Sequence, residues 1–145
     1  EDCTFDQCNL SLATLRSTKL MKVRFENCKI EGVRFDHCDQ FVLDFSFFSC
    51  KIRHCNFSNL NLKKCQFIGC SLNDSDFVGT NLIEASFKGS DLAGTVFNTA
   101  DLSKSDFTDA IHYAINPMNN KVKKAKFSAS EVVALLSHLD IIIQK

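Results

Sequence analysis

The chain is short of several residue types that shape ordinary globular domains. It has one proline, five glycines, no tryptophan and no net charge over its 145 residues. A single proline is compatible with a chain that forms hydrogen-bonded ladders over most of its length, since proline removes a backbone donor. No run of about 20 apolar residues occurs, so we expect no membrane-spanning segment. The chain begins with Glu1 rather than methionine, which is compatible with a trimmed or incomplete N-terminus.

Patterns of catalytic and metal-binding residues are absent as well. The sequence has no glycine-rich nucleotide loop and no Cys-x2-Cys spacing, and its four histidines are not paired with a nucleophile. We therefore predict a protein without enzyme activity, cofactor or metal site.

What the sequence does contain is a five-residue rhythm of large apolar side chains. In CNFSNLNLKKCQFIGCSLNDSDF, residues 55–77, Phe and Leu alternate at every fifth position. A single α-helix would spread such residues around its whole surface, and a single strand would send them to opposite faces. A chain that turns a corner every five residues points all of them inward, as in a solenoid. The predicted repeat core consists of Phe57, Leu62, Phe67, Leu72, Phe77, Leu82, Phe87, Leu92, Phe97, Leu102 and Phe107.

The two positions before each apolar centre are also restricted. The first of them is small, as at Ser75, Thr80 and Ala85, and the second is often Asn or Asp, whose side chains bond to turn backbone. This code, clear in ASFKGSDLAGTVFNTADLSKSDF, resembles that of the pentapeptide-repeat family over about residues 3–110. The resemblance implies an all-β solenoid, a right-handed quadrilateral β-helix with four five-residue sides per coil. The alternation of Phe and Leu independently requires an even number of sides, so positions four repeats apart should stack.

The rhythm slips once. The interval from Phe35 to Ile52 exceeds three full repeats by two positions, which places two extra residues within 38–50, where Gln40 occupies a position that should be apolar. One interpretation is a tolerated insertion. The other is a protruding contact loop, because loops on a regular scaffold often carry recognition. Its candidate contact residues are Phe41, Phe47 and Phe48.

Eight cysteines in a short chain would ordinarily suggest a disulfide framework. Here every cysteine falls two positions before a centre, in the slot that elsewhere holds Ala, Ser or Thr. We therefore predict buried, reduced thiols that act as small core residues, which favours a cytoplasmic protein. They are Cys3, Cys8, Cys28, Cys38, Cys50, Cys55, Cys65 and Cys70.

Residues 111–145 depart from the repeat, so we predict that the β-helix ends at residue 110. Ser128 and Glu131 have the spacing of a capping box, which predicts a short amphipathic α-helix followed by an apolar strand. A similar cap joins two rods end to end in the Qnr and MfpA members of the family, and the resemblance therefore implies a homodimer. A monomeric cap is the alternative. The predicted cap residues are Val132, Leu135, Leu136, Leu139, Ile141, Ile142 and Ile143.

The resemblance also raises a specific function. Qnr-type members are described as acidic mimics of DNA that bind DNA gyrase or topoisomerase and protect it from quinolones. This chain has 17 acidic and 17 basic residues, and folding the sequence by the length of one coil spreads Asp76, Asp91 and Asp101 over different sides. We therefore expect a protein-interaction scaffold with an unknown protein partner, and we keep Qnr-like gyrase binding as the alternative. The lysines at 121–126 do not by themselves predict contact with nucleic acid.

Overall fold

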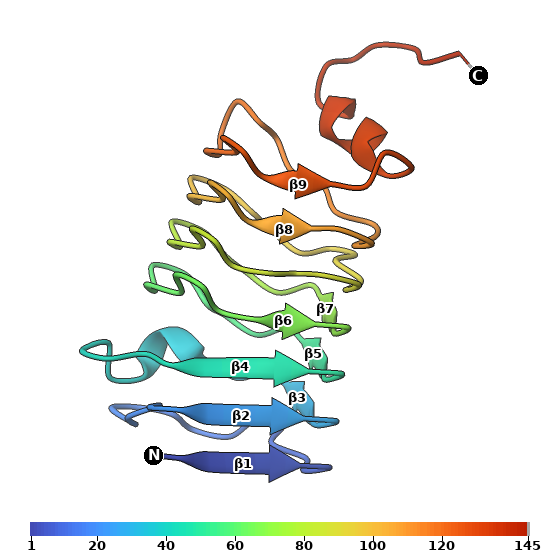
Figure 1. Cartoon of the computed structure of the whole chain (residues 1–145). Helices are drawn as coiled ribbons and strands as arrows, with labels where there is room; N and C mark the ends of the chain where they lie inside the picture. The colour runs from blue at the N-terminus through green and yellow to red at the C-terminus, as the bar shows by residue number, and fades with distance from the viewer. Residues whose placement is uncertain (145) are drawn as a thin grey trace.

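The chain folds into a β-solenoid whose coils stack from the N-terminus to the C-terminus (Figure 1). The computed structural model describes residues 1–144. Its elements in chain order are β1 (Cys3–Asp6), β2 (Val23–Glu26), β3 (Lys29–Glu31), the 3₁₀-helix η1 (Phe35–His37), β4 (Phe45–Phe48), β5 (Lys51–Arg53), β6 (Phe67–Ile68), β7 (Ser71–Asn73), β8 (Asp106–Phe107), β9 (Lys126–Phe127) and the 3₁₀-helix η2 (Val132–Leu136).

Each coil has four sides, and all pairing between coils is parallel. The strands form the sheets β1-β2-β4-β6, β3-β5-β7 and β8-β9. Between them, single bridges at every fifth position join a residue to its counterpart four repeats later. Successive examples are Asn56 to Asp76, Asn61 to Asn81, Gln66 to Ser86 and Ser71 to Asp91, and the next, Asp76 to Val96, returns to the first side. The coil of four five-residue sides that the repeat predicts is confirmed.

Columns of phenylalanine rings fill the interior. Phe67 stacks on Phe47 and on Phe87, with ring centroids 5.1 Å away in each case. A second column, which includes Phe57 and Phe77, meets the first edge to face, as in the 5.5 Å contact between Phe57 and Phe67. Both arrangements are favourable for aromatic rings. All eleven side chains of the predicted repeat core are buried.

The corners between the sides require an unusual backbone. The residue two after each centre has a positive φ, as at Asn59, Lys64, Asp74 and Glu84, with Gly79 at the equivalent corner. This left-handed conformation is unfavourable for most residues, but it turns the chain sharply enough to begin the next side. Hydrogen bonds between coils, such as Asn59 N–H to the Val78 carbonyl at 2.9 Å, hold these corners in place.

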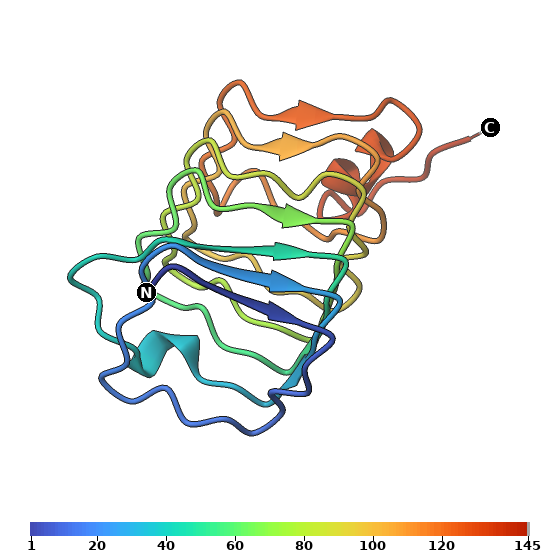
Figure 2. The same ribbon diagram turned by 60° about the horizontal axis from the view of Figure 1, so that its bottom comes forward.

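The two extra residues form a loop in the second coil. Phe25 pairs with Phe47, two positions beyond its regular partner at residue 45. The surplus is accommodated between Asp39 and Asp44, and this segment projects from the stack (Figure 2). The loop lies within residues 38–50, the segment to which the sequence assigns the register break.

The solenoid extends one coil beyond the predicted boundary at residue 110, and that boundary was wrong. Asp91 bridges to Ile111, Asp101 to Lys121, and β8 pairs with β9 at Phe107 and Phe127. The pattern was obscured because this coil is irregular. Phe97 bridges to Ile115, two positions short of its regular partner at residue 117, and a turn at 116–119 restores the register.

The C-terminal segment also differs from its prediction. In place of an α-helix, η2 is a 3₁₀-helix with no side-chain cap, so the capping box does not form. The Ser128 hydroxyl instead accepts a hydrogen bond from the backbone N–H of Asp109 at 2.8 Å. Ile141, Ile142 and Ile143 do not pair as a strand. Without a neighbouring chain to pair with, three β-branched residues do not make a strand.

Candidate interaction surfaces

The position two before each centre holds small side chains that tie one coil to the next. The Thr80 hydroxyl donates to the Phe57 carbonyl at 2.9 Å, and the Ser90 hydroxyl donates to the Phe67 carbonyl at 2.7 Å. The Cys28 thiol makes the same contact with the Phe5 carbonyl at 3.2 Å. The small-residue code therefore serves hydrogen bonding between coils as well as packing.

The cysteines occupy this structural slot, and burial makes several of them less reactive. Burial raises the pKa of the Cys55 thiol to about 11 and that of Cys38 to about 11, so both are poor nucleophiles at neutral pH. Cys3, however, is exposed and Cys8 is half-buried, in the first coil of the described residues. The prediction that all eight thiols are buried was wrong for these two. Within residues 1–144, no group of three or more His, Cys, Asp or Glu side chains is arranged to hold a metal ion.

The inserted loop presents one large apolar side chain to solvent. Phe41 is 91% exposed, and Val42 beside it is also exposed. The loop is fixed at both ends, since Asp39 N–H bonds to the Thr18 carbonyl and Asp44 N–H bonds to the Leu20 carbonyl, each at 2.9 Å. The Asp39 carboxylate additionally accepts the N–H of Phe41 at 2.9 Å. Phe41 therefore lies on an ordered turn.

The other two predicted loop residues belong to β4. Phe47 is a fully buried member of the core, so assigning it to a contact loop was wrong. Phe48 is half-buried on the outside of the same strand, where the Arg24 guanidinium lies 3.7 Å from its ring centroid. This distance is typical of a cation–π contact.

A second apolar surface lies at the C-terminal end. Ala134 and Leu135 of η2 pack against the core and cover part of the last coil. The remaining apolar side chains of the segment face solvent. They are Val132, Val133, Leu136, Leu139, Ile141, Ile142 and Ile143. In Figure 1 this segment extends away from the stack beyond η2. No helix in residues 1–144 is long and apolar enough to cross a membrane.

A comparison with protein-family models agrees with the five-residue repeat of the sequence and with the coils of the structure. The model described as "Pentapeptide repeat region" matches residues 1–77 and 60–135. The chain belongs to the pentapeptide-repeat family. The second match extends past residue 127, in agreement with the additional coil. A comparison with curated proteins finds no match.

One solved structure has the same fold. A trypsin-treated variant of QnrB1, a plasmid-mediated fluoroquinolone resistance protein, aligns with a TM-score of 0.84 and 17% identity, over 99% of this chain and 69% of that one. Rfr23 from the cyanobacterium Cyanothece 51142 aligns with a TM-score of 0.30 and 14% identity, over 88% of this chain and 89% of its own. Only the first score is high enough to support a common arrangement of coils, and at this identity it supports the fold alone.

Proposed function

We propose that this pentapeptide-repeat protein is a non-catalytic scaffold for protein–protein interaction. The observation that carries the proposal is Phe41, a large apolar side chain 91% exposed on an ordered loop. Exposed aromatic residues are frequent anchors of protein interfaces. Because the loop is already ordered by its hydrogen bonds, a partner that contacts Phe41 does not have to order it, and the entropic cost of binding is reduced.

The proposal includes a homodimer formed through the C-terminal segment. Ile142 is 86% exposed, and its neighbours Ile141 and Ile143 are about half exposed. A contiguous apolar surface of this kind is unusual on a monomer and typical of an interface. A second copy of the segment is the natural occupant, because a symmetric dimer brings identical apolar surfaces together. This is how the rods of the Qnr type are joined.

The state of the eight cysteine thiols is relevant to the cellular compartment of the protein. None of them forms a disulfide within the described residues, and six are buried in a structural slot. Such thiols are compatible with a reducing compartment, and we propose that the protein is cytoplasmic.

A second candidate is Qnr-like binding to DNA gyrase or topoisomerase. It is favoured by the TM-score of 0.84 with QnrB1, whose description as a fluoroquinolone resistance protein fits protection of that enzyme. The net charge of zero opposes it, because mimicry of DNA requires a strongly negative surface. The scaffold is therefore the better supported function.

One set of measurements separates the two candidates and tests the dimer. Gyrase supercoiling is assayed with purified wild-type protein, with and without a fluoroquinolone, beside the variant Ile141→Ser, Ile142→Ser, Ile143→Ser. We expect no effect of either protein on supercoiling or its inhibition. In light scattering we expect a wild-type dimer and a monomeric variant, because the substitutions remove the apolar area that drives association.

The control is Leu12→Ser, which changes another exposed apolar residue at the opposite end of the solenoid and should leave the dimer intact. Wild-type protein that protects gyrase, together with a triple variant that does not, would establish the second candidate. A monomeric wild type would rule out dimerisation through the C-terminal segment.

A further inference from the structure

Lysines gather along one edge of the solenoid. The edge is the corner that follows the side centred on Leu62, Leu82 and Leu102, and its residues stack coil upon coil. Lys64 N–H bonds to the Ile83 carbonyl at 2.9 Å, and Lys104 N–H bonds to the Lys123 carbonyl at 2.8 Å. We call this corner the lysine edge. Its basic residues are Lys22, Lys63, Lys64, Lys104, Lys123 and Lys124.

The backbone at this corner turns the lysines outward. Lys22, Lys64, Lys104 and Lys124 have φ between 52° and 64°, the left-handed conformation that closes each side. All six lysines of the edge are exposed. In the described residues only Lys22 of this set forms an ion pair, with Asp2 at 3.9 Å. The positive charge of the other five is therefore available to a partner.

The carboxylates near these lysines are fewer than the lysines. Glu1, Asp2, Asp44 and Glu84 occupy the edge itself, and Asp106 lies on the adjoining side. Glu84 and Asp106 line a shallow surface hollow of about 550 Å³ together with Lys104, Lys124 and Lys126. Basic residues therefore outnumber acidic ones on the edge itself, six to four.

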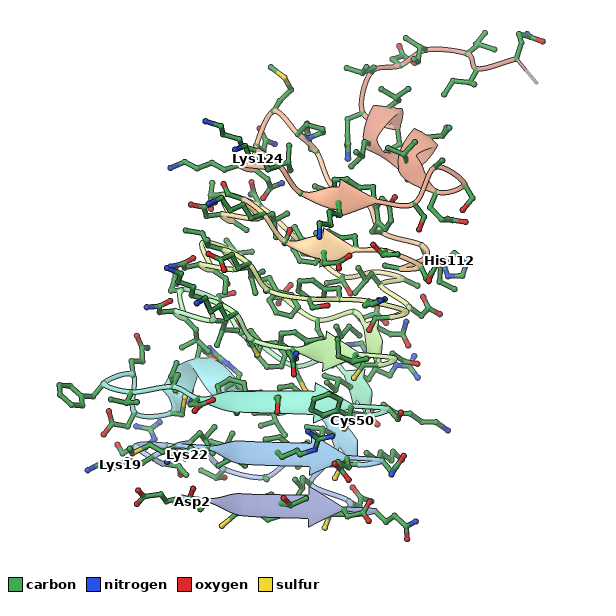
Figure 3. The ribbon with its side chains drawn as sticks, in the orientation of Figure 1. Asp2, Lys19, Lys22, Cys50, His112 and Lys124 are labelled. Carbon is green, nitrogen blue, oxygen red and sulfur yellow. The ribbon has the colours of Figure 1, made fainter. Side chains whose placement is uncertain are left out.

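The Phe41 loop lies on the same edge. Leu43 and Asp44, at the end of the loop, line a surface hollow with Lys63 and Lys64 of the next coil. Figure 3 shows Lys22 and Lys124 on the side of the stack from which the loop projects, one below it and one above it. The edge therefore combines one exposed aromatic side chain with lysines in the coils on both sides of it.

We propose that the lysine edge and the Phe41 loop together bind an acidic polypeptide segment that carries apolar residues. Carboxylates of the segment lie against Lys64, Lys104 and Lys124, and an apolar side chain lies against Phe41. This inference rests on the proposed scaffold function and names the chemistry of its partner.

The composition of the edge favours a polypeptide over nucleic acid. Glu84 and Asp106 lie among the lysines and would repel the phosphates of a nucleic acid, whose backbone offers no hydrogen-bond donors to them. A polypeptide offers both carboxylates for the lysines and backbone N–H groups for these two carboxylates. The edge itself also lacks arginine, the residue best suited to bidentate phosphate contacts.

The spacing along the edge suits an extended segment. Lys64 and Lys124 are separated by three coil steps, and stacked rings in these coils are 5.0–5.2 Å apart. An extended chain advances about 3.3 Å per residue, so roughly five residues cover this distance. Carboxylates on alternate residues point to the same side and can all face the lysines.

The test uses two fluorescent ten-residue peptides, one of glutamate alone and one with two central leucines. Their affinities are measured by anisotropy at low salt. We expect both peptides to bind and the leucine peptide to bind more tightly. The double variant Lys104→Glu, Lys124→Glu should lower the affinity for both peptides about tenfold, because two attractive contacts become repulsive. Phe41→Ser should lower the affinity for the leucine peptide only.

The matched control is Lys29→Glu, Lys51→Glu, which makes the same change of net charge on β3 and β5, on another side of the solenoid. It should change both affinities less than about twofold, within the range expected for exposed charges that a ligand does not contact. A glutamate already occupies the equivalent corner at Glu84, with φ 58°, so the substitutions at 104 and 124 are compatible with the fold.

Equal loss of affinity in the two charge variants would overturn the proposal, as would failure of both peptides to bind. Binding of a single-stranded oligothymidylate as tight as that of the peptides would overturn it too, in favour of nucleic acid. If the peptides fail while light scattering still gives a dimer and gyrase is unaffected, this inference alone is lost. The scaffold function would then stand.

Discussion

Replacing Phe67 by alanine is expected to lower the free energy of unfolding by about 3–5 kcal/mol, the usual cost of removing a buried aromatic side chain. Phe67 is fully buried. Its ring stacks between Phe47 and Phe87 and meets Phe57 and Phe77 edge to face, with centroids 5.5 Å away. Because each coil contacts only its neighbours, a cavity here weakens the link between the two halves of the solenoid.

The measurement is urea-induced unfolding, and the chain offers a control with the same chemical change. Phe41→Ala removes an identical side chain that is almost fully exposed, and its effect should stay within about 0.5 kcal/mol. Similar losses in the two variants would contradict the assignment of Phe67 to the core. A transition that splits into two after Phe67→Ala would indicate that the halves unfold separately.

The regular coils could be predicted from the sequence because their geometry repeats with their residues. Positions four repeats apart stack directly, so a residue and its counterpart in the next coil have the same environment. Phe57, Phe77 and Phe97, for example, stack in one column and are all buried. The local sequence pattern therefore also predicts the packing between coils. This is uncommon in globular proteins, where contacts join unrelated segments.

Prediction failed where the register shifts. Two extra residues between Phe35 and Ile52 fit several positions, and Phe47 was assigned to the loop. It lies one repeat before Ile52, so counting backward from the next regular coil would have placed it in the core. The last coil was missed for a similar reason, since His112 breaks the pattern locally. Phe127 nevertheless pairs with Phe107 in the regular register.

The lysine edge was missed because the position immediately before each centre was used to compare charges. Those residues, such as Asp91 and Asp101, take part in local turns, since the carboxylate of each accepts the N–H two residues later at 3.1 Å. The residues that project from the corner lie two positions after the centre. That position requires a positive φ. A glycine there would indicate the corner in the sequence, but a lysine does not.

Replacing Asn120 by alanine is the second change for which we expect a large effect, a loss of about 2–3 kcal/mol in the free energy of unfolding. Asn120 occupies the small-residue slot of the irregular last coil and is buried. Its side-chain oxygen accepts the Ala100 N–H at 3.0 Å, and its amide donates to the carbonyls of Phe97 at 3.1 Å and Asn116 at 3.0 Å. Alanine would leave these buried backbone groups without partners, at about 1–3 kcal/mol for an unsatisfied group.

The effect should be local, because the three bonds join the turn at 116–119 to the coil below it. Hydrogen exchange should therefore increase at Ala100 and over residues 115–127 while the amides of β4 and β6 stay protected. Asn61→Ala is the control, since Asn61 lies on the exposed surface and its oxygen bonds to the Asn81 side chain at 3.1 Å. Unchanged exchange at Ala100 in Asn120→Ala would show that the coil does not depend on this amide. Faster exchange confined to the last coil would show that the side-chain hydrogen bonds of Asn120 hold this irregular coil onto the regular coil below it.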